Sequence, residues 1–275
     1  MQSLIGRDLK EATLTITVAL RGALNLWPWI VAGKANDSLP ADDTFSLAIV
    51  RAVTIDAAWP EGYGVSSTRW HQGEAGEDWT SDGQERELCW LQIEPLVDPN
   101  RPLPTGVALS VLSDVLGRIG DWTFSGAHAV VPIRQGVTPL LSASSTRSWF
   151  ELGDPQNRRD FNICVSLEGQ NDDVLDTANF RDSLNYYGAG LVSFEDLGGH
   201  SSARRITGDD IVHSVDNGLT MWFSCQAREW TVDLASWVID LVGGCLRENG
   251  ATGFTAISVQ SSGRFQRGAG TEPLR

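Results

Sequence analysis

The chain has few cysteines, and none of them forms a recognisable framework. Its 275 residues include four cysteines, and no two have the C-x-x-C spacing that is typical of metal or redox sites. Each lies within an apolar strand or helix pattern, so we interpret all four as small buried hydrophobic residues. A chain of this length buries roughly 70–75% of its unfolded surface and needs no cross-link to fold. The four are Cys89, Cys164, Cys225 and Cys245.

Long apolar runs are also missing. No stretch approaches 18 consecutive apolar residues, and the N-terminus lacks the basic and then apolar pattern of a signal peptide. Hydrophobic residues make up 41% of the chain and charged residues 20%, which are the proportions of a folded globular protein. The sequence therefore predicts a cytoplasmic protein that does not span a membrane.

Positive charge is scarce. Lysine and arginine together number 21 against 35 aspartate and glutamate residues, which gives a net charge of −14. Nucleic acids and anionic membranes attract proteins through clustered lysine and arginine, so neither is expected as the main partner. An acidic surface instead favours a basic protein partner.

The signatures of several common enzyme classes are absent. The sequence contains no Walker-type phosphate loop, no Rossmann glycine fingerprint, no G-x-S-x-G elbow and no H-E-x-x-H motif. Its four histidines are scattered singly along the chain. These absences remove the usual signals for a nucleotide, hydrolase or zinc site, and the sequence names no cofactor and no metal site.

The clearest pattern present is a strand, helix and strand over residues 219–260. Residues 219–228 are rich in apolar and aromatic side chains, and residues 254–259 alternate with the period of a half-buried strand. Thr231 is a plausible N-cap for the helix between them, and Gly250 suits its C-terminal cap. The helix carries an apolar stripe at steps of three and four residues: Leu234, Trp237, Val238, Leu241, Val242 and Cys245.

The same pattern recurs 130 positions earlier in the chain. When the sequence is shifted by 130 positions, the apolar stripe of this helix falls on apolar residues of an earlier segment, and Gly250 falls on Gly120. Phe254 falls on Phe124, so the exit strands agree in the same register. Two unrelated segments of similar length would explain the match as well, but agreement of stripe, cap and strand favours an internal duplication.

Taken in chain order, each half is predicted to contain strand, helix, two strands, helix and strand. This is the ferredoxin-like order, so the expected fold class is α+β, with two tandem ferredoxin-like (βαββαβ) halves and antiparallel sheets with helices on one face. The halves are expected at residues 1–134 and 160–260, joined by a linker at 135–159 and followed by a loose tail at 261–275. The expected strands are residues 12–20, 45–55, 87–96, 122–133, 161–167, 190–194, 219–228 and 254–259, and the expected helices are a short one from near Trp27, 105–119, 176–187 and the helix of the stripe.

Two long irregular insertions are predicted, each between the second and third strands of its half. The first, residues 57–86, places large aromatic rings among acidic residues, a combination that favours a protein-binding surface. The alternative is that this loop folds back and buries its own rings. The predicted partner-binding residues are Trp59, Trp70, Glu77, Asp78 and Trp79.

The second insertion, residues 195–218, offers a different hypothesis. Its paired arginines could hold an anionic small molecule, because guanidinium groups bind carboxylate or phosphate in a bidentate manner. Residues of both insertions would then line a cavity between the halves, namely His71, His200, Arg204 and Arg205. The first hypothesis is thus a non-catalytic acidic protein of inhibitor or immunity type that binds a basic protein, and the alternative is a small-molecule enzyme or ligand binder.

Overall fold

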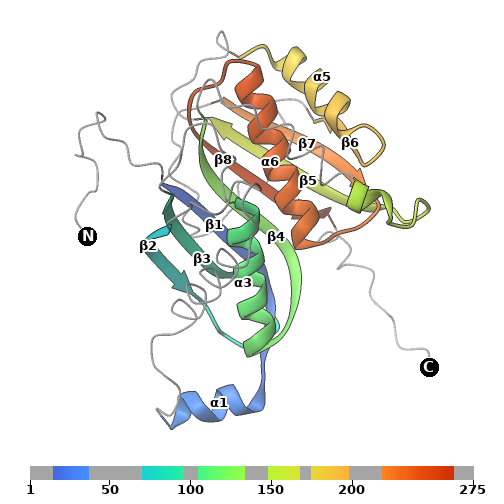
Figure 1. The fold of residues 1–275 in the computed structure, drawn as a ribbon. Coiled ribbons are helices and arrows are strands. Elements are labelled where there is room, and N and C mark those ends of the chain that lie inside the picture. The colour runs from blue at the N-terminus through green and yellow to red at the C-terminus, as the bar shows by residue number, and fades with distance from the viewer. Residues whose placement is uncertain are drawn as a thin grey trace, which may run out of the picture.

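The computed structural model describes residues 15–36, 70–95, 105–133, 148–167, 175–197 and 219–262. Eight strands in these ranges form one continuous antiparallel sheet with the order β2-β3-β1-β4-β8-β5-β7-β6. Three helices, α3, α5 and α6, pack on one side of the sheet (Figure 1). The mixed helix and strand content confirms the α+β class.

The first half of the chain supplies one side of this sheet. Its elements, in chain order, are β1 (Ile16–Leu26), α1 (Pro28–Ala35), β2 (Trp70–Glu77), β3 (Arg86–Pro95), α3 (Thr105–Ile119) and β4 (Gly120–Ile133). The helix predicted at 105–119 has these same bounds in the structure, and the short helix expected near Trp27 is α1.

The second half supplies the other side in reversed order. Its elements are β5 (Arg159–Leu167), α5 (Thr177–Gly188), β6 (Val192–Asp196), β7 (Leu219–Ala227), α6 (Val232–Glu248) and β8 (Gly253–Ser261). Each corresponds to a predicted element within a few residues at its ends.

Capping and an apolar stripe account for α6. The Thr231 hydroxyl accepts a hydrogen bond from the backbone N–H of Leu234 at 3.1 Å, which satisfies a donor that the first turn leaves free. At the other end Gly250 adopts a φ of 84°, the left-handed conformation that closes many helices. Between these ends the stripe, including Trp237, Val238 and Leu241, is buried in a core that also contains residues of α3.

The two halves meet at strands β4 and β8, whose pairing corrects the expectation of two separate four-stranded sheets. Both are the outermost strands of their halves, and they pair antiparallel along Gly126↔Gln260 to Ile133↔Gly253. Pairing removes two unsatisfied sheet edges at once. His128 lies opposite Ser258, and these two positions are 130 residues apart. Two positions that the 130-residue shift superposes therefore lie opposite each other in this ladder.

Strand β2 differs from the sequence expectation. Residues 70–77 were expected within an irregular loop, yet they pair with β3 at the edge of the sheet. Two glycines and two glutamates give this segment little strand propensity. Tertiary packing compensates, because the Trp90 ring lies so close over Gly76 that a Cβ there would be 2.2 Å from its Nε1 atom. The strand predicted at 45–55 lies outside the described residues.

The predicted linker also contains ordered structure. A helical turn at residues 148–151 lies within it, and Phe150 is buried with its ring 5.7 Å from that of Trp237. None of the described helices has the length and apolar character needed to cross a membrane.

Candidate functional site

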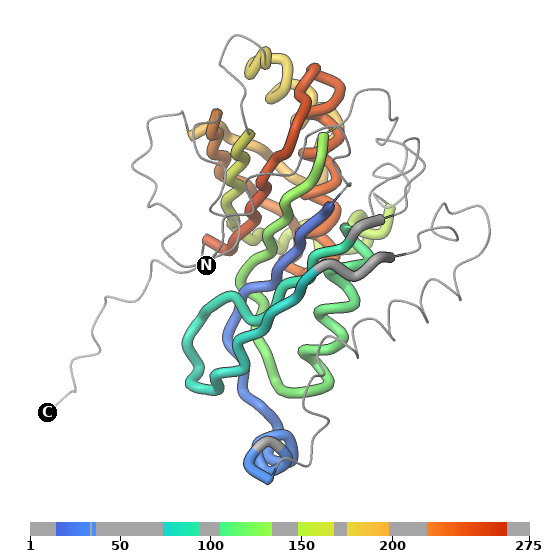
Figure 2. Tube along the Cα trace, turned by 90° about the vertical axis from the view of Figure 1, so that its left-hand side faces the viewer, coloured from blue at the N-terminus to red at the C-terminus, as the bar shows by residue number. Residues whose placement is uncertain are grey.

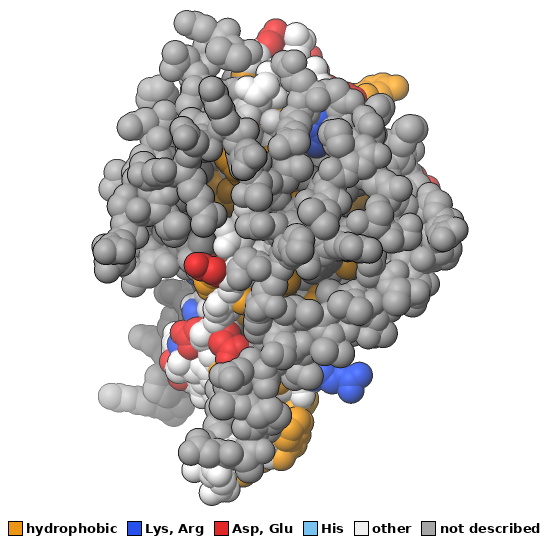
Figure 3. Space-filling model, turned by 60° about the vertical axis from the view of Figure 1, so that its left-hand side comes forward, with side chains coloured by type: hydrophobic (Ala, Val, Ile, Leu, Met, Phe, Trp, Pro, Cys, Tyr) orange, Lys and Arg blue, Asp and Glu red, His pale blue; other side chains and the backbone are white. Residues whose placement is uncertain are grey.

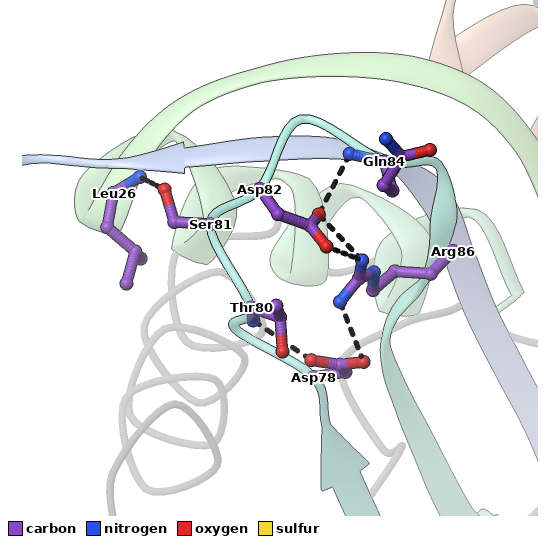
Figure 4. A network of polar contacts seen from close by, with 7 residues as sticks. All are labelled: Leu26, Asp78, Thr80, Ser81, Asp82, Gln84 and Arg86. Carbon is purple, nitrogen blue, oxygen red and sulfur yellow. Dashed lines mark hydrogen bonds and ion pairs between the residues drawn. The ribbon is translucent and has the colours of Figure 1, made fainter.

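The loop between β2 and β3 carries an ordered group of carboxylates. The Asp78 carboxylate accepts a hydrogen bond from the backbone N–H of Thr80, and that of Asp82 accepts one from the N–H of Gln84, each at 2.9 Å. Such short side-chain to backbone bonds fix tight turns. Figure 4 shows both carboxylates turned toward the guanidinium group of Arg86.

Arg86 bridges the two aspartates. Its Nη2 atom lies 2.6 and 2.7 Å from the two oxygens of Asp82, and its Nη1 atom lies 3.4 Å from Oδ2 of Asp78. The pKa of Asp78 is lowered by its hydrogen bonds with Thr80 and by the charge of Arg86. The pKa of Asp82 is lowered by hydrogen bonds from the Gln84 N–H and from Arg86. Both carboxylates therefore stay charged well below neutral pH.

The acidic loop, residues 78–85, is attached to the end of β1. The backbone N–H of Leu26 donates a hydrogen bond to the Ser81 hydroxyl at 3.0 Å. The next residue, Trp27, donates its N–H to the carbonyl of Ile119 at 3.0 Å, and α1 begins immediately afterwards. The loop and α1 therefore lie toward the same end of the first half; in Figure 2, α1 is at the bottom and the loop is at the lower left of the strands.

Helix α1 exposes apolar side chains at this end. The exposed fractions are 60% for Trp29, 50% for Val31 and 38% for Trp27. Figure 3 shows hydrophobic and acidic side chains at the same end of the molecule. These three residues were not among the predicted site residues. Their signal in the sequence was a short apolar stretch around Pro28 that lacks any polar face.

The structure separates the predicted partner-binding residues. Glu77 and Asp78 are exposed at the end of β2 and the start of the acidic loop. Trp79 is only partly exposed and packs against the hydrophobic core, as the fold-back alternative predicted for this ring. Trp70 belongs to β2, where it pairs with Pro95, and Trp59 lies outside the described residues.

The predicted small-molecule site is less well placed. His71 lies on β2, at one edge of the sheet, opposite Glu94 of β3. His200, Arg204 and Arg205 lie outside the described residues, and the strands that flank them, β6 and β7, are at the opposite edge.

The four cysteines are buried and form no disulfide. Burial raises the pKa of the Cys164 thiol to about 11, and it raises the pKa of the other three thiols further. Reactive cysteines are partly exposed thiolates, so these side chains have the properties of core residues. Within the described residues, no group of three or more histidine, cysteine, aspartate or glutamate side chains is arranged to hold a metal ion.

Comparisons with protein-family models, with curated proteins and with solved structures found no match.

Proposed function

We propose that this protein is a non-catalytic acidic binding protein that engages a basic protein, in the manner of an inhibitor or an immunity protein. The observation that carries the proposal is the acidic loop, whose aspartates are both ordered and exposed. The Asp78 and Asp82 side chains remain 49% and 46% exposed although each is bonded to the loop backbone and to Arg86.

The hydrogen bonds to Thr80 and Gln84 fix the turns of the loop, but the ion pairs of the two carboxylates with Arg86 add little to the stability of the fold. Exposed ion pairs contribute roughly 0–1 kcal/mol, because water and salt screen them. Carboxylates fixed in advance would instead lose little conformational freedom when a partner binds, which favours association. The net charge of −14 would add long-range attraction toward a basic partner and speed its approach.

We further propose that the two halves are tandem ferredoxin-like units that arose by duplication. The strand orders support this proposal, because β2-β3-β1-β4 and β8-β5-β7-β6 are the strand order of a ferredoxin-like unit read in opposite directions. The 130-residue separation of His128 and Ser258, which lie opposite each other, also supports it. A cytoplasmic location is also proposed, and four cysteines without a disulfide are consistent with it.

The small-molecule alternative receives less support from the junction between the halves. There β4 and β8 pair continuously, and α3 packs against α6. The Thr105 hydroxyl donates a 2.6 Å hydrogen bond to the Asp240 carboxylate across these helices. Among the described residues, strand pairing and helix packing thus join the two halves directly.

The proposal is tested by identifying what the protein binds and how charge affects it. The full chain is purified from its own host for native mass spectrometry, and the co-purifying protein is then reconstituted from pure components. Affinity should fall steeply with added salt. Glu77→Lys, at the acidic loop, should weaken binding about tenfold or more, which corresponds to about 1.4 kcal/mol.

The matched control is Glu195→Lys. This residue is also an exposed glutamate on an edge strand, β6, but at the far side of the sheet. It makes the same change in net charge, but β6 lies at the opposite edge of the sheet from β2, where water and salt screen the charge, so affinity should stay within about twofold. A partner without basic character, or equal effects of the two variants, would contradict the proposal.

A further inference from the structure

Helix α1 is anchored by one side and leaves the other side uncovered. Ile30 is 4% exposed and Gly33, one turn later, is also buried. The backbone N–H groups of Ile30 and Val31 donate to the carbonyl of Trp27 at 3.0 and 3.2 Å, which holds the first turn. The exposed side chains of α1 are therefore presented by an ordered helix.

The uncovered side is unusual for a surface helix. Helices at protein surfaces normally direct polar residues to water, but α1 exposes Pro28, Trp29, Val31 and Ala32 there. With Trp27, these residues expose on the order of 300 Å² of apolar area, since a tryptophan presents roughly 250 Å² when fully exposed. Patches of this size on soluble proteins are often interaction sites.

Charged residues border the patch unevenly. The acidic loop lies beside it, because Leu26 is bonded to Ser81 and directly precedes Trp27. Asp121, also exposed, pairs with Asn25 near the same end of β1. Arg118 is also exposed and directly precedes Ile119, whose carbonyl accepts the N–H of Trp27, so the described side chains at the border include a cation along with the acidic groups.

We propose that α1 is a docking site for a protein segment that combines an apolar anchor with flanking lysine or arginine residues, an inference that rests on the proposed function. The anchor contacts Trp29 and Val31, and the cationic residues lie against the acidic loop. The faces of Trp27 and Trp29 also suit a guanidinium group, through attraction of the cation to the ring. A second copy of this chain does not fit, because it would bring two chains of net charge −14 and their acidic loops together.

The test compares two tryptophans that have almost the same exposure. Trp29 is 60% exposed on α1, and Trp149 is 61% exposed on the turn between the halves. The full chain is titrated with a fluorescein-labelled peptide that repeats Leu-Lys-Lys-Leu, and with a second peptide that carries Glu in place of Lys. Trp29→Ala should weaken binding of the lysine peptide about tenfold or more, whereas Trp149→Ala should change it less than about twofold.

Separate outcomes distinguish this inference from the proposed function. If Glu77→Lys weakens peptide binding and Trp29→Ala does not, the acidic surface binds without α1 and the inference is wrong. If only Trp29→Ala weakens it and salt has no effect, α1 binds its partner but the proposed basic partner is wrong.

Three further results would overturn the inference. They are equal binding of both peptides, no binding of the lysine peptide up to about 1 mM, and a dimer in analytical ultracentrifugation that Trp29→Ala dissociates. Sedimentation of the wild-type chain, but not of Trp29→Ala, with phosphatidylserine vesicles would assign α1 to a membrane instead. Unchanged thermal melting of both tryptophan variants confirms that each is folded, as their exposure predicts.

Discussion

Helices α1 and α5 each follow the first strand of their half, yet they lie differently against the sheet. Helix α5 buries Phe180 and Leu184, and its first turn is capped by Asp176, which accepts hydrogen bonds from the N–H groups of Ala178 and Asn179. Helix α1 projects from the end of β1 (Figure 1). Among the side chains of α1 that the structure describes, Ile30 is the one large side chain that is buried.

The spacing of apolar residues explains the difference. Phe180 and Leu184 are four residues apart and share one face, so α5 can bury that face while polar residues remain in water. In α1 the apolar residues surround the helix, so burying any one face leaves others exposed. The two halves thus have the same order of elements, but the pattern of residues within each helix decides how that helix packs.

The largest expected effect compares the buried side chains of these helices. Phe180→Ala should lower the free energy of unfolding by about 3–5 kcal/mol, because it leaves a cavity beside Phe223, whose ring centroid is 5.9 Å away. Ile30→Ala should cost about 2 kcal/mol or less, since α1 can detach without opening the core. Urea unfolding followed by circular dichroism measures both values. Equal losses would show that α1 is as much part of the core as α5.

A smaller effect is expected at two glycines that the 130-residue shift makes equivalent. A Cβ on Gly120 would lie 2.5 Å from the backbone oxygen of Asn25, whereas Gly250 has open space around it but a φ of 84°. Gly120→Ala should destabilise by about 1–3 kcal/mol through overpacking, and Gly120→Asn at least as much.

Gly250→Ala should cost about 1–2 kcal/mol because of its left-handed backbone. Gly250→Asn should be less harmful, because asparagine tolerates that conformation. Thermal unfolding of the four variants compares the two positions. If the asparagine variant is more stable than the alanine variant at both positions, both glycines are needed for their backbone conformation. The proposed difference, a steric requirement at Gly120 and a backbone requirement at Gly250, would then be wrong.

The smallest effect concerns Asp240, whose equivalent in α3 is Ser110. Burial raises the pKa of Asp240 from 3.8 to about 6, although the hydrogen bond from Thr105 and the charge of Arg247 oppose the rise. The folded protein thus binds this proton more tightly than the unfolded chain, so the stabilisation is complete below pH 4 and is lost as the pH rises through 6.

Asp240→Asn keeps an oxygen for Thr105 but cannot ionise. It should therefore raise stability at pH 7 by about 1 kcal/mol, because the amide avoids the cost of burying a charged carboxylate. Urea unfolding at several values between pH 4 and 7 should give a flatter curve than the wild type. Ser110→Ala, at the equivalent position, should leave the pH dependence unchanged, and an unaltered curve for Asp240→Asn would contradict the raised pKa.

Sequence reasoning succeeded where the pattern was local and strong. The stripe and caps of α6 and the bounds of α3 follow from the spacing of apolar residues and from Thr231 and Gly250. It failed at β2, because the pairing of a glycine-rich segment depends on β3 and on Trp90. For the candidate site, it selected Glu77 and Asp78 as partner-binding residues, and the structure shows both to be exposed. It did not select Trp29, whose exposure depends on which side of α1 meets the rest of the protein.

By itself the sequence determined the α+β class and the order of most elements, because helix and strand periods are properties of neighbouring residues. Only the tertiary structure decided that the last strands of the two halves, β4 and β8, pair into a single sheet. It also decided that the acidic loop lies beside α1 at the end of β1. Both outcomes join residues that are far apart in the chain, and such pairings depend on the shapes and edges of the folded halves rather than on local sequence.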